Sequence, residues 1–376
     1  MQVSDVGKIL KPGEALGQYR VKHLLGQGGF GVTYLAEDIN LKCDVAIKEY
    51  MPEMIAYRDS NTAVHPKSDE DREAFLWGLS RFIDEARTLA KFRHPNIVRV
   101  ITVFEQNQTA YMVMDYERGH DLRAVFRNSE YISESFLKQI TWPIVDGLSD
   151  VHRSGYIHRD IKPTNIILRE DGSPVLLDFG SARLAVGCKT QTLTAMVSVG
   201  YAPLEQYTED NQHQQGPWTD IYALGAVLYY AITGKPPVDS TLRGSAVVNH
   251  QADPLEPVNL RDDSQYSQSF CEAIDWALNF RIADRPQTIE QWLPKLFAGD
   301  VGYSSIGKVR MPVVTFSPVD AEPARYSTDI GHSGNASYAQ NDRLPTNSRR
   351  SNTNASSAGS RGKVLTAWSG FRHLTS

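Results

Sequence analysis

The hydrophobic pattern of this chain changes its period part-way along, and that change limits the folds open to it. The first part contains strand-like runs, rich in β-branched and aromatic residues and separated by glycine and polar residues. These runs cover residues 18–26, 31–39, 44–51, 97–106 and 109–117. After Asp121 the apolar residues recur at helical spacing. A sheet-rich part followed by a helix-rich part predicts an α+β fold with two lobes.

One helix is expected inside the sheet-rich part, over residues 71–92, and Pro95 lies just beyond it. The longest helix of the second part is predicted over residues 133–155, where Pro143 is a candidate kink. Further helices are predicted over residues 218–233, 267–279 and 288–297. The first of these is so apolar that we expect it to be buried.

The composition is that of a globular protein, with 41% hydrophobic residues and a net charge of −5, which argues against a nucleic-acid partner. Cys43, Cys188 and Cys271 are far apart, which is typical of reduced thiols in a cytoplasmic protein. The N-terminus has no apolar leader segment, and no run of apolar residues is long enough for a transmembrane helix. A peripheral membrane contact stays open.

The two ends differ from the rest of the chain. Residues 1–17 form a short lead-in. Residues 299–376 are rich in Ser, Asn and Gly and poor in large apolar side chains, so we expect a disordered tail. Its last apolar stretch, VLTAWSGFRHL, is either a frayed end or a docking segment, and we favour the frayed end.

A glycine-rich segment lies between the first two strand-like runs. It consists of Gly26, Gln27, Gly28, Gly29, Phe30 and Gly31. A dinucleotide-binding loop of this kind would open a helix, but a strand-like run follows here. That context favours a hairpin whose backbone covers the phosphates of ATP. An ordinary hairpin turn is the alternative, and the segment alone cannot exclude it.

Lys48 lies on a strand-like run between apolar neighbours and can aim its charge at the α- and β-phosphates. Such a charge needs a carboxylate partner, and the helix over residues 71–92 offers Glu85 and its neighbour Asp84. We prefer Glu85, because it shares a helix face with Phe82 and Leu89.

A dense group of polar residues, HRDIKPTN, is flanked by apolar residues. Asp160 can orient a hydroxyl and accept its proton, and Lys162 can neutralise a transferring phosphoryl group. Asn165 can offer a neutral oxygen to Mg²⁺ or Mn²⁺, and Asp178 follows an apolar run as the main metal ligand. Phosphoryl transfer needs charges placed around a polyphosphate, which is what these segments provide in order.

On these motifs, residues 18–298 resemble the protein kinase superfamily, and they look most like the eukaryotic-like Ser/Thr protein kinases of bacteria. The phrases LGQGGFGVTYLAED, HPNIVRV and GYAPLEQY carry that likeness. The resemblance implies a β-rich N-lobe (18–114), a hinge (115–118) and a helical C-lobe (119–298), with ATP bound in the cleft between them.

The resemblance also assigns roles to residues that the motifs do not reach. It implies a gatekeeper, hinge contacts, a ribose contact and apolar contacts to adenine. The gatekeeper is Met114, the hinge contacts are Asp115 and Glu117, and the ribose contact is Asp121. The apolar contacts to adenine are Thr33, Ala46 and Ile167. Thr33 stands where the family usually has Val, and its shape is similar.

The C-lobe positions follow in the same way. Ser198 matches the hydroxyl that contacts the catalytic Asp and Lys in Ser/Thr kinases, which favours Ser/Thr over Tyr acceptors. Glu205 matches a carboxylate that pairs with an Arg, here Arg285, and Asp220 matches the residue that braces the catalytic loop. We assign the last three structural roles. The usual Ala-Pro-Glu reads Pro-Leu-Glu here, but Glu205 is retained.

Regulation is also implied by the resemblance. Arg159 falls where the family often binds a phosphate on the activation loop, and that loop contains Thr190, Thr192 and Thr194. We therefore predict autophosphorylation, with Thr192 and Thr194 as the preferred sites, in addition to the phosphorylation of Ser and Thr in protein substrates.

Two other function classes compete with an active Ser/Thr kinase. One is a non-catalytic scaffold, and the other is a small-molecule phosphotransferase of similar fold. The presence of Lys48, Asp160, Asn165 and Asp178 argues against the scaffold, and Lys162 with Ser198 argues against the small-molecule enzyme. Residues 49–70 are longer than usual for the family, and we favour a plain insertion over a regulatory loop.

Overall fold

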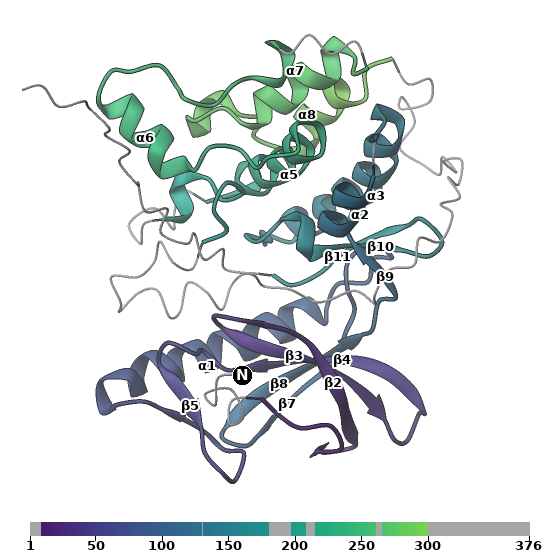
Figure 1. Ribbon diagram of the computed structural model, residues 1–376, viewed down its shortest axis with the longest axis vertical. Helices are drawn as coiled ribbons and strands as arrows, with labels where there is room; N and C mark the ends of the chain where they lie inside the picture. Colours follow the sequence, from purple (N-terminus) through teal and green to yellow (C-terminus); the bar gives the residue numbers. More distant parts are fainter. Residues whose placement is uncertain (1–8, 130, 180–196, 208–214, 261–264, 300–376) are drawn as a thin grey trace, which may run out of the picture. The chain divides into compact units, whose positions relative to one another are not determined.

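The computed structural model describes residues 9–129, 131–179, 197–207, 215–260 and 265–299 (Figure 1). All of them belong to the first compact unit of the chain, residues 1–331. The predicted tail, residues 300–376, and Thr190, Thr192 and Thr194 of the predicted activation loop lie outside the described residues.

The strand-like runs form one antiparallel sheet, in the order β1-β2-β3-β4-β8-β7. Its strands are β1 (Ala15–Leu16), β2 (Tyr19–Gly28), β3 (Gly31–Asp38), β4 (Cys43–Tyr50), β7 (Val100–Gln106) and β8 (Thr109–Asp115). The short β1 comes from the lead-in, where Leu10 is also buried and donates its N–H to the Tyr34 hydroxyl. The end of the lead-in is therefore part of the sheet's packing.

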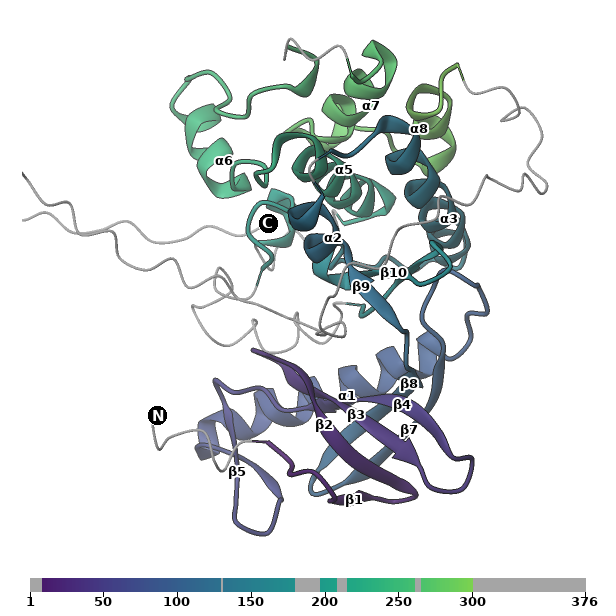
Figure 2. The ribbon, with the colours of Figure 1, turned by 45° about the vertical axis from the view of Figure 1, so that its right-hand side comes forward.

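Helix α1 (Asp69–Leu89) lies against this sheet, and Figures 1 and 2 show it running along one face. The Ser68 side chain accepts the Asp71 N–H and caps the helix, so it begins two residues before the predicted start. Phe75, Phe82 and Leu89 are buried, as their helical spacing predicted.

The long segment after β4 forms a hairpin of its own. Strands β5 (Ala56–Arg58) and β6 (Val64–Pro66) pair in antiparallel fashion, with Arg58 opposite Val64. Residues 49–70 therefore contain regular structure that the sequence pattern did not reveal.

The second part of the chain combines a small sheet with helices. The sheet has the order β11-β10-β9 and consists of β9 (Gly119–Asp121), β10 (Ile166–Arg169) and β11 (Pro174–Leu176). The helices are α2 (Leu122–Asn128), α3 (Glu134–Arg153), α5 (Pro217–Thr233), α6 (Ser240–Val248), α7 (Gln268–Ala277) and α8 (Ile289–Leu296). Helices α2 and α6 were not predicted, because each is short.

Helix α5 is the core of this second part, as its apolar sequence predicted. Most of its residues are buried, and it packs on α7. Trp292 of α8 is fully buried, and its indole N–H donates to the Ala273 carbonyl at 2.8 Å. No helix within the described ranges combines the length and the apolar character needed to cross a membrane.

Gly119 is the first residue of β9, shortly after β8 ends, and no side chain fits at this position. Its φ is +154°, and a Cβ there would lie 2.1 Å from the Leu168 carbonyl oxygen. We expect Gly119→Ala to lower the free energy of unfolding by about 3 kcal/mol or more, because the backbone of β10 must move. Urea unfolding measures this.

Gly155→Ala is the matched control. Gly155 has a φ of +78° but nothing within 4 Å of the added Cβ, so only the backbone term of about 1 kcal/mol applies. Equal losses for the two variants would show that the contact with Leu168 has no energetic effect.

Candidate active site

The backbone of the predicted catalytic loop is held by Asp220, from the first turn of α5. This carboxylate accepts the N–H of His158 at 2.8 Å, the N–H of Arg159 at 2.9 Å and Nε2 of His152 at 2.8 Å. Arg159 has a φ of +70°, a region that few residues other than glycine adopt. Asp220 thus holds the loop in a conformation that it would not adopt alone, in agreement with its predicted structural role.

The charge of Asp220 is maintained although the side chain is fully buried. Burial raises the pKa of this carboxyl, but the hydrogen bond from His152 and the backbone N–H donors outweigh it, and the net pKa is lowered. Helix α5 adds to this effect, because the positive end of its dipole lies in the first turn.

Four predicted residues come together in front of this anchor. Asn165 donates from its amide nitrogen to the Asp160 carbonyl at 2.9 Å and to Oδ2 of Asp160 at 2.7 Å. The Ser198 hydroxyl donates to Oδ1 of Asp160 at 2.8 Å. Lys162 Nζ lies 3.4 Å from Oδ2 of Asp160 and 3.4 Å from the Ser198 hydroxyl. The buried Asp160 carboxylate is therefore fixed in orientation by three side chains.

Lys48 of β4 and Asp178 after β11 form an ion pair, with Nζ and Oδ1 at 3.1 Å. Asp178 has a φ of +40°, so its side chain is presented from an unusual backbone conformation. Our preference for Glu85 over Asp84 agrees with burial, since Glu85 is buried and Asp84 is exposed. In the described part of the chain, however, no ion pair joins Lys48 to Glu85. That pairing stays a prediction.

The glycine-rich segment forms a tight hairpin between β2 and β3. Gly26, Gln27 and Gly28 pair with Thr33, Val32 and Gly31 in register. Gly31 is required by space, because a Cβ there would lie 2.2 Å from the Glu49 carbonyl oxygen of β4. Gly29 and Phe30 form the tip.

The predicted adenine contacts line neighbouring strands. Thr33 of β3 lies directly opposite Lys48 of β4, and Ala46 of β4 lies opposite Met114 of β8. Ile167 belongs to β10 and is fully buried. The register thus places Ala46 and the gatekeeper side by side, and their contact with adenine stays a prediction.

The hinge residues have partners that the sequence did not suggest. Both carboxylate oxygens of Glu117 accept from Arg169 of β10, at 2.6 and 2.8 Å. Asp121 caps α2 through Oδ1, which accepts the Ala124 N–H at 2.8 Å. Its contact with a ribose stays a prediction. Burial raises the pKa of Asp121 and also that of Asp115.

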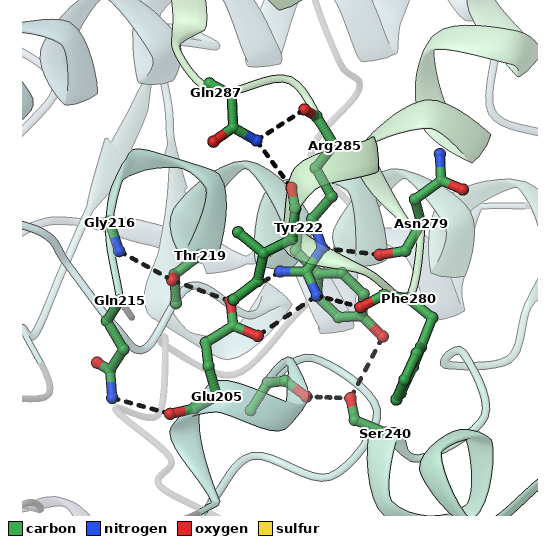
Figure 3. Close-up of polar contacts among 12 residues, drawn as sticks. Glu205, Gln215, Gly216, Thr219, Tyr222, Ser240, Asn279, Phe280, Arg285 and Gln287 are labelled. Carbon is green, nitrogen blue, oxygen red and sulfur yellow. Dashed lines mark hydrogen bonds and ion pairs between the residues drawn. The ribbon is translucent and has the colours of Figure 1, made fainter. Parts of the chain in front are cut away.

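Glu205 and Arg285 form the ion pair that the resemblance implied (Figure 3). Arg285 Nη1 lies 2.7 Å from Oε1 of Glu205, and the guanidinium stacks over the Tyr222 ring. The Thr219 hydroxyl also donates to Glu205 at 3.1 Å. Thr219 precedes Asp220 in α5, so one helix turn fixes both the ion pair and the catalytic loop.

Two supporting residues were missed, His158 and Arg169, and a motif contains only the first of them. The ring of His158 lies 2.7 Å from the Leu177 carbonyl through Nε2 and 4.3 Å from the Phe179 ring, centroid to centroid. His158 therefore joins the catalytic loop to the segment that carries Asp178. Its place beside Asp160 was the available signal. For Arg169, which binds the hinge, the sequence has no comparable signal.

A family model described as protein kinase domain matches residues 19–297. The chain belongs to the protein kinase family. A solved structure titled "PpkA-294 apo form" is 38% identical, with a TM-score of 0.69, and the match covers 77% of this chain and 99% of that one. The predicted resemblance and the two-lobed α+β kinase fold are thereby confirmed.

The curated relatives are bacterial kinases. Serine/threonine-protein kinase B of Synechocystis is 29% identical over 336 residues, which is 86% of this chain and 54% of that protein. Serine/threonine-protein kinase PrkC of Bacillus subtilis is 32% identical over 235 residues, or 62% of this chain and 33% of that protein. The chain therefore spans a third to about half of the length of these kinases.

The Asp220 anchor makes the stability of this kinase domain depend on pH. The folded-state pKa of Asp220 lies below the ordinary value of 3.8, so as the pH falls the unfolded chain binds the proton first. The contribution of Asp220 is therefore complete above about pH 5 and is lost as the pH falls through the folded-state pKa. Its slope approaches about 1.4 kcal/mol per pH unit.

Asp220→Asn tests this anchor by urea unfolding. At pH 7 we expect a loss of about 3 kcal/mol, because one carboxylate that serves three donors becomes an amide. Below pH 4 the difference between variant and wild type should shrink. A difference that stays constant down to pH 3 would contradict a charged, stabilising Asp220.

Proposed function

We propose that this chain is a Ser/Thr protein kinase that transfers the γ-phosphoryl group of ATP to Ser and Thr hydroxyls of proteins. The observation that carries the proposal is the oriented Asp160 carboxylate, held by Asn165, Ser198 and Lys162. Membership of the protein kinase family supports it.

The chain's own groups suit this reaction. An Asp160 oxygen can accept the proton of an incoming hydroxyl, since each carboxylate oxygen accepts more than one hydrogen bond. Lys162, on the same carboxylate, can neutralise charge on the transferring group. Lys48 can hold the α- and β-phosphates, and the backbone of the glycine-rich hairpin can cover them. The hydroxyl oxygen forms its bond to phosphorus as the bond to the β-phosphate oxygen breaks.

Asn165 and Asp178 fit a divalent cation. The amide nitrogen of Asn165 is committed to Asp160, so its oxygen is the atom that remains for a cation. Mg²⁺ prefers such oxygen ligands and commonly takes only one or two from protein, with substrate phosphates and water. When bound, Mg²⁺ or Mn²⁺ would neutralise charge on the β- and γ-phosphate oxygens.

Ser198 favours a protein hydroxyl as acceptor. It contacts both Asp160 and Lys162, so the segment after the predicted activation loop touches the reacting group directly. A small-molecule phosphotransferase would not need that contact. The scaffold alternative is disfavoured because Lys48, Asp160, Asn165 and Asp178 are all present and buried or paired.

The proposal includes autophosphorylation at Thr190, Thr192 or Thr194, with Arg159 as the partner of the phosphate. It also includes location in the cytoplasm, which is supported by the free thiols Cys43 and Cys271.

The deciding experiment is transfer of labelled phosphate from ATP, with Mg²⁺, to the chain itself and to a generic basic protein. Asp160→Asn and Lys48→Ala should each lower the rate by about 10²- to 10⁴-fold, because one removes the proton acceptor and the other the phosphate contact. Mass spectrometry should place the label on Ser and Thr.

Gly155→Ala adds a Cβ that would meet nothing within 4 Å, so it is the control for handling and folding and should transfer at the wild-type rate. If folded wild type binds ATP but transfers nothing, the scaffold becomes the better description. If Thr190, Thr192 and Thr194 carry no label in an active preparation, the autophosphorylation sites are wrong.

The metal requirement gives a separate prediction. Transfer should stop in EDTA and return with Mg²⁺ or Mn²⁺. Asp178→Asn should raise the Mg²⁺ concentration needed for half-maximal rate by about tenfold or more, because a neutral amide replaces the charged ligand. An unchanged Mg²⁺ titration would exclude Asp178 as a metal ligand.

A further inference from the structure

The segment that follows β4 is hydrogen-bonded to the tip of the glycine-rich hairpin. Met51 donates its N–H to the Phe30 carbonyl at 3.0 Å, and Glu53 donates its N–H to the Gly29 carbonyl at 3.1 Å. These bonds continue the pairing of β3 with β4 past its last register pair, Gly31 with Tyr50. The tip is therefore bound to residues of the insertion rather than projecting alone.

The insertion is itself anchored to the sheet by a buried carboxylate. Glu49 is fully buried and accepts the hydroxyl of Tyr111 at 2.7 Å and that of Tyr34 at 3.0 Å. Arg58 of β5 forms an ion pair with the same carboxylate. These side chains come from β3, β4, β8 and the insertion, so one charged group joins them all.

Backbone contacts complete the attachment. Arg58 also donates from Nη1 to the Thr62 carbonyl at 2.7 Å, which closes the β5–β6 hairpin. Val64 donates its N–H to the Asn107 carbonyl, between β7 and β8, at 2.8 Å. Lys67 donates its N–H to the Ile55 carbonyl at 2.8 Å. The hairpin is thus fixed at both ends and in its middle.

This network lies next to the proposed phosphate-binding residue, because Glu49 follows Lys48 in β4. Neighbouring residues of a strand point to opposite faces of a sheet, so Lys48 faces Asp178 while Glu49 faces Arg58. Burial of the Glu49–Arg58 pair is tolerated only while both charges remain paired. The hairpin therefore has one well-defined position, and Met51 and Glu53 take theirs from it.

We propose that residues 51–67 of the insertion form a brace that holds the glycine-rich hairpin in place for ATP, and that Arg58 is a positioning residue for nucleotide binding. The proposal rests on the proposed kinase function. A hairpin held in advance loses less conformational entropy when its backbone closes over phosphates, so the brace should act on ATP affinity.

The brace can be tested by removing one hydrogen bond, from the Glu53 N–H to the Gly29 carbonyl. Glu53 is the second residue of a turn in which the Pro52 carbonyl accepts the Ile55 N–H, and proline fits that position. Glu53→Pro removes the N–H that binds Gly29, whereas Glu53→Ala keeps it. We expect Glu53→Pro to raise the KM for ATP about five- to tenfold with kcat changed less than about twofold, and Glu53→Ala to stay within about twofold of wild type.

Arg58 tests the anchor. Arg58→Met should raise the KM for ATP by about tenfold and increase hydrogen exchange at the Met51 amide, while Arg58→Lys should recover part of both. The KM for a protein substrate should not change. Arg243→Met is the matched control, because it removes another buried arginine, paired with Asp253 at 2.7 Å in the C-lobe. It should lower thermal stability but leave the KM for ATP unchanged.

The outcomes separate the two ideas. Wild type that transfers no phosphate overturns the proposed function. Active Glu53→Pro with a wild-type KM for ATP overturns the brace alone. If Arg58→Met does not fold, the Glu53 pair still decides. A KM for ATP that rises as much in Arg243→Met as in Arg58→Met would reduce the role of Arg58 to general stability and overturn its assignment.

Discussion

The buried carboxylate of Asp220 is the constraint on which the catalytic loop depends. The loop holds Asp160 against Asn165, Ser198 and Lys162 while Arg159 adopts a positive φ. It keeps this shape because two of its N–H groups bind one charged side chain. That side chain belongs to α5, the most buried helix of the C-lobe. Core packing therefore supplies the rigidity that places the reacting group, and Thr219 extends the same support to the Glu205–Arg285 pair.

The N-lobe repeats this solution with a different carboxylate. Glu49 gathers donors from β3, β8 and the insertion, just as Asp220 gathers them from the catalytic loop and α3. Each carboxylate lies next to a residue with a proposed role in the chemistry. Glu49 follows Lys48 in β4, and Asp220 binds the N–H groups of His158 and Arg159, which precede Asp160. A buried charge is costly unless every partner is in place, which favours one arrangement over all others.

Local patterns predicted those parts of this fold that have local causes. Hydrophobic spacing predicted α1, α3, α5 and the strands of the large sheet other than β1. Asp160, Asn165, Lys162 and Ser198 meet as their motifs indicated. The β5–β6 hairpin could not be predicted, because its strands are only three residues long and its partners, Glu49 and Asn107, lie outside it. Asn107 is distant in sequence, as are the two members of the Glu117–Arg169 pair, which was also missed.

The Lys48–Asp178 pair illustrates why motif spacing alone does not determine partners. The motifs place two acidic residues, Glu85 and Asp178, near Lys48, and in the structure it is Asp178 whose Oδ1 lies 3.1 Å from Nζ. The ammonium group of Lys48, which we propose binds phosphate, therefore lies directly beside Asp178, the proposed metal ligand. Opposite charges in contact can separate toward a polyphosphate and its divalent cation at low cost, because each charge exchanges one counter-ion for another. Such a pair suits a site that must bind both together.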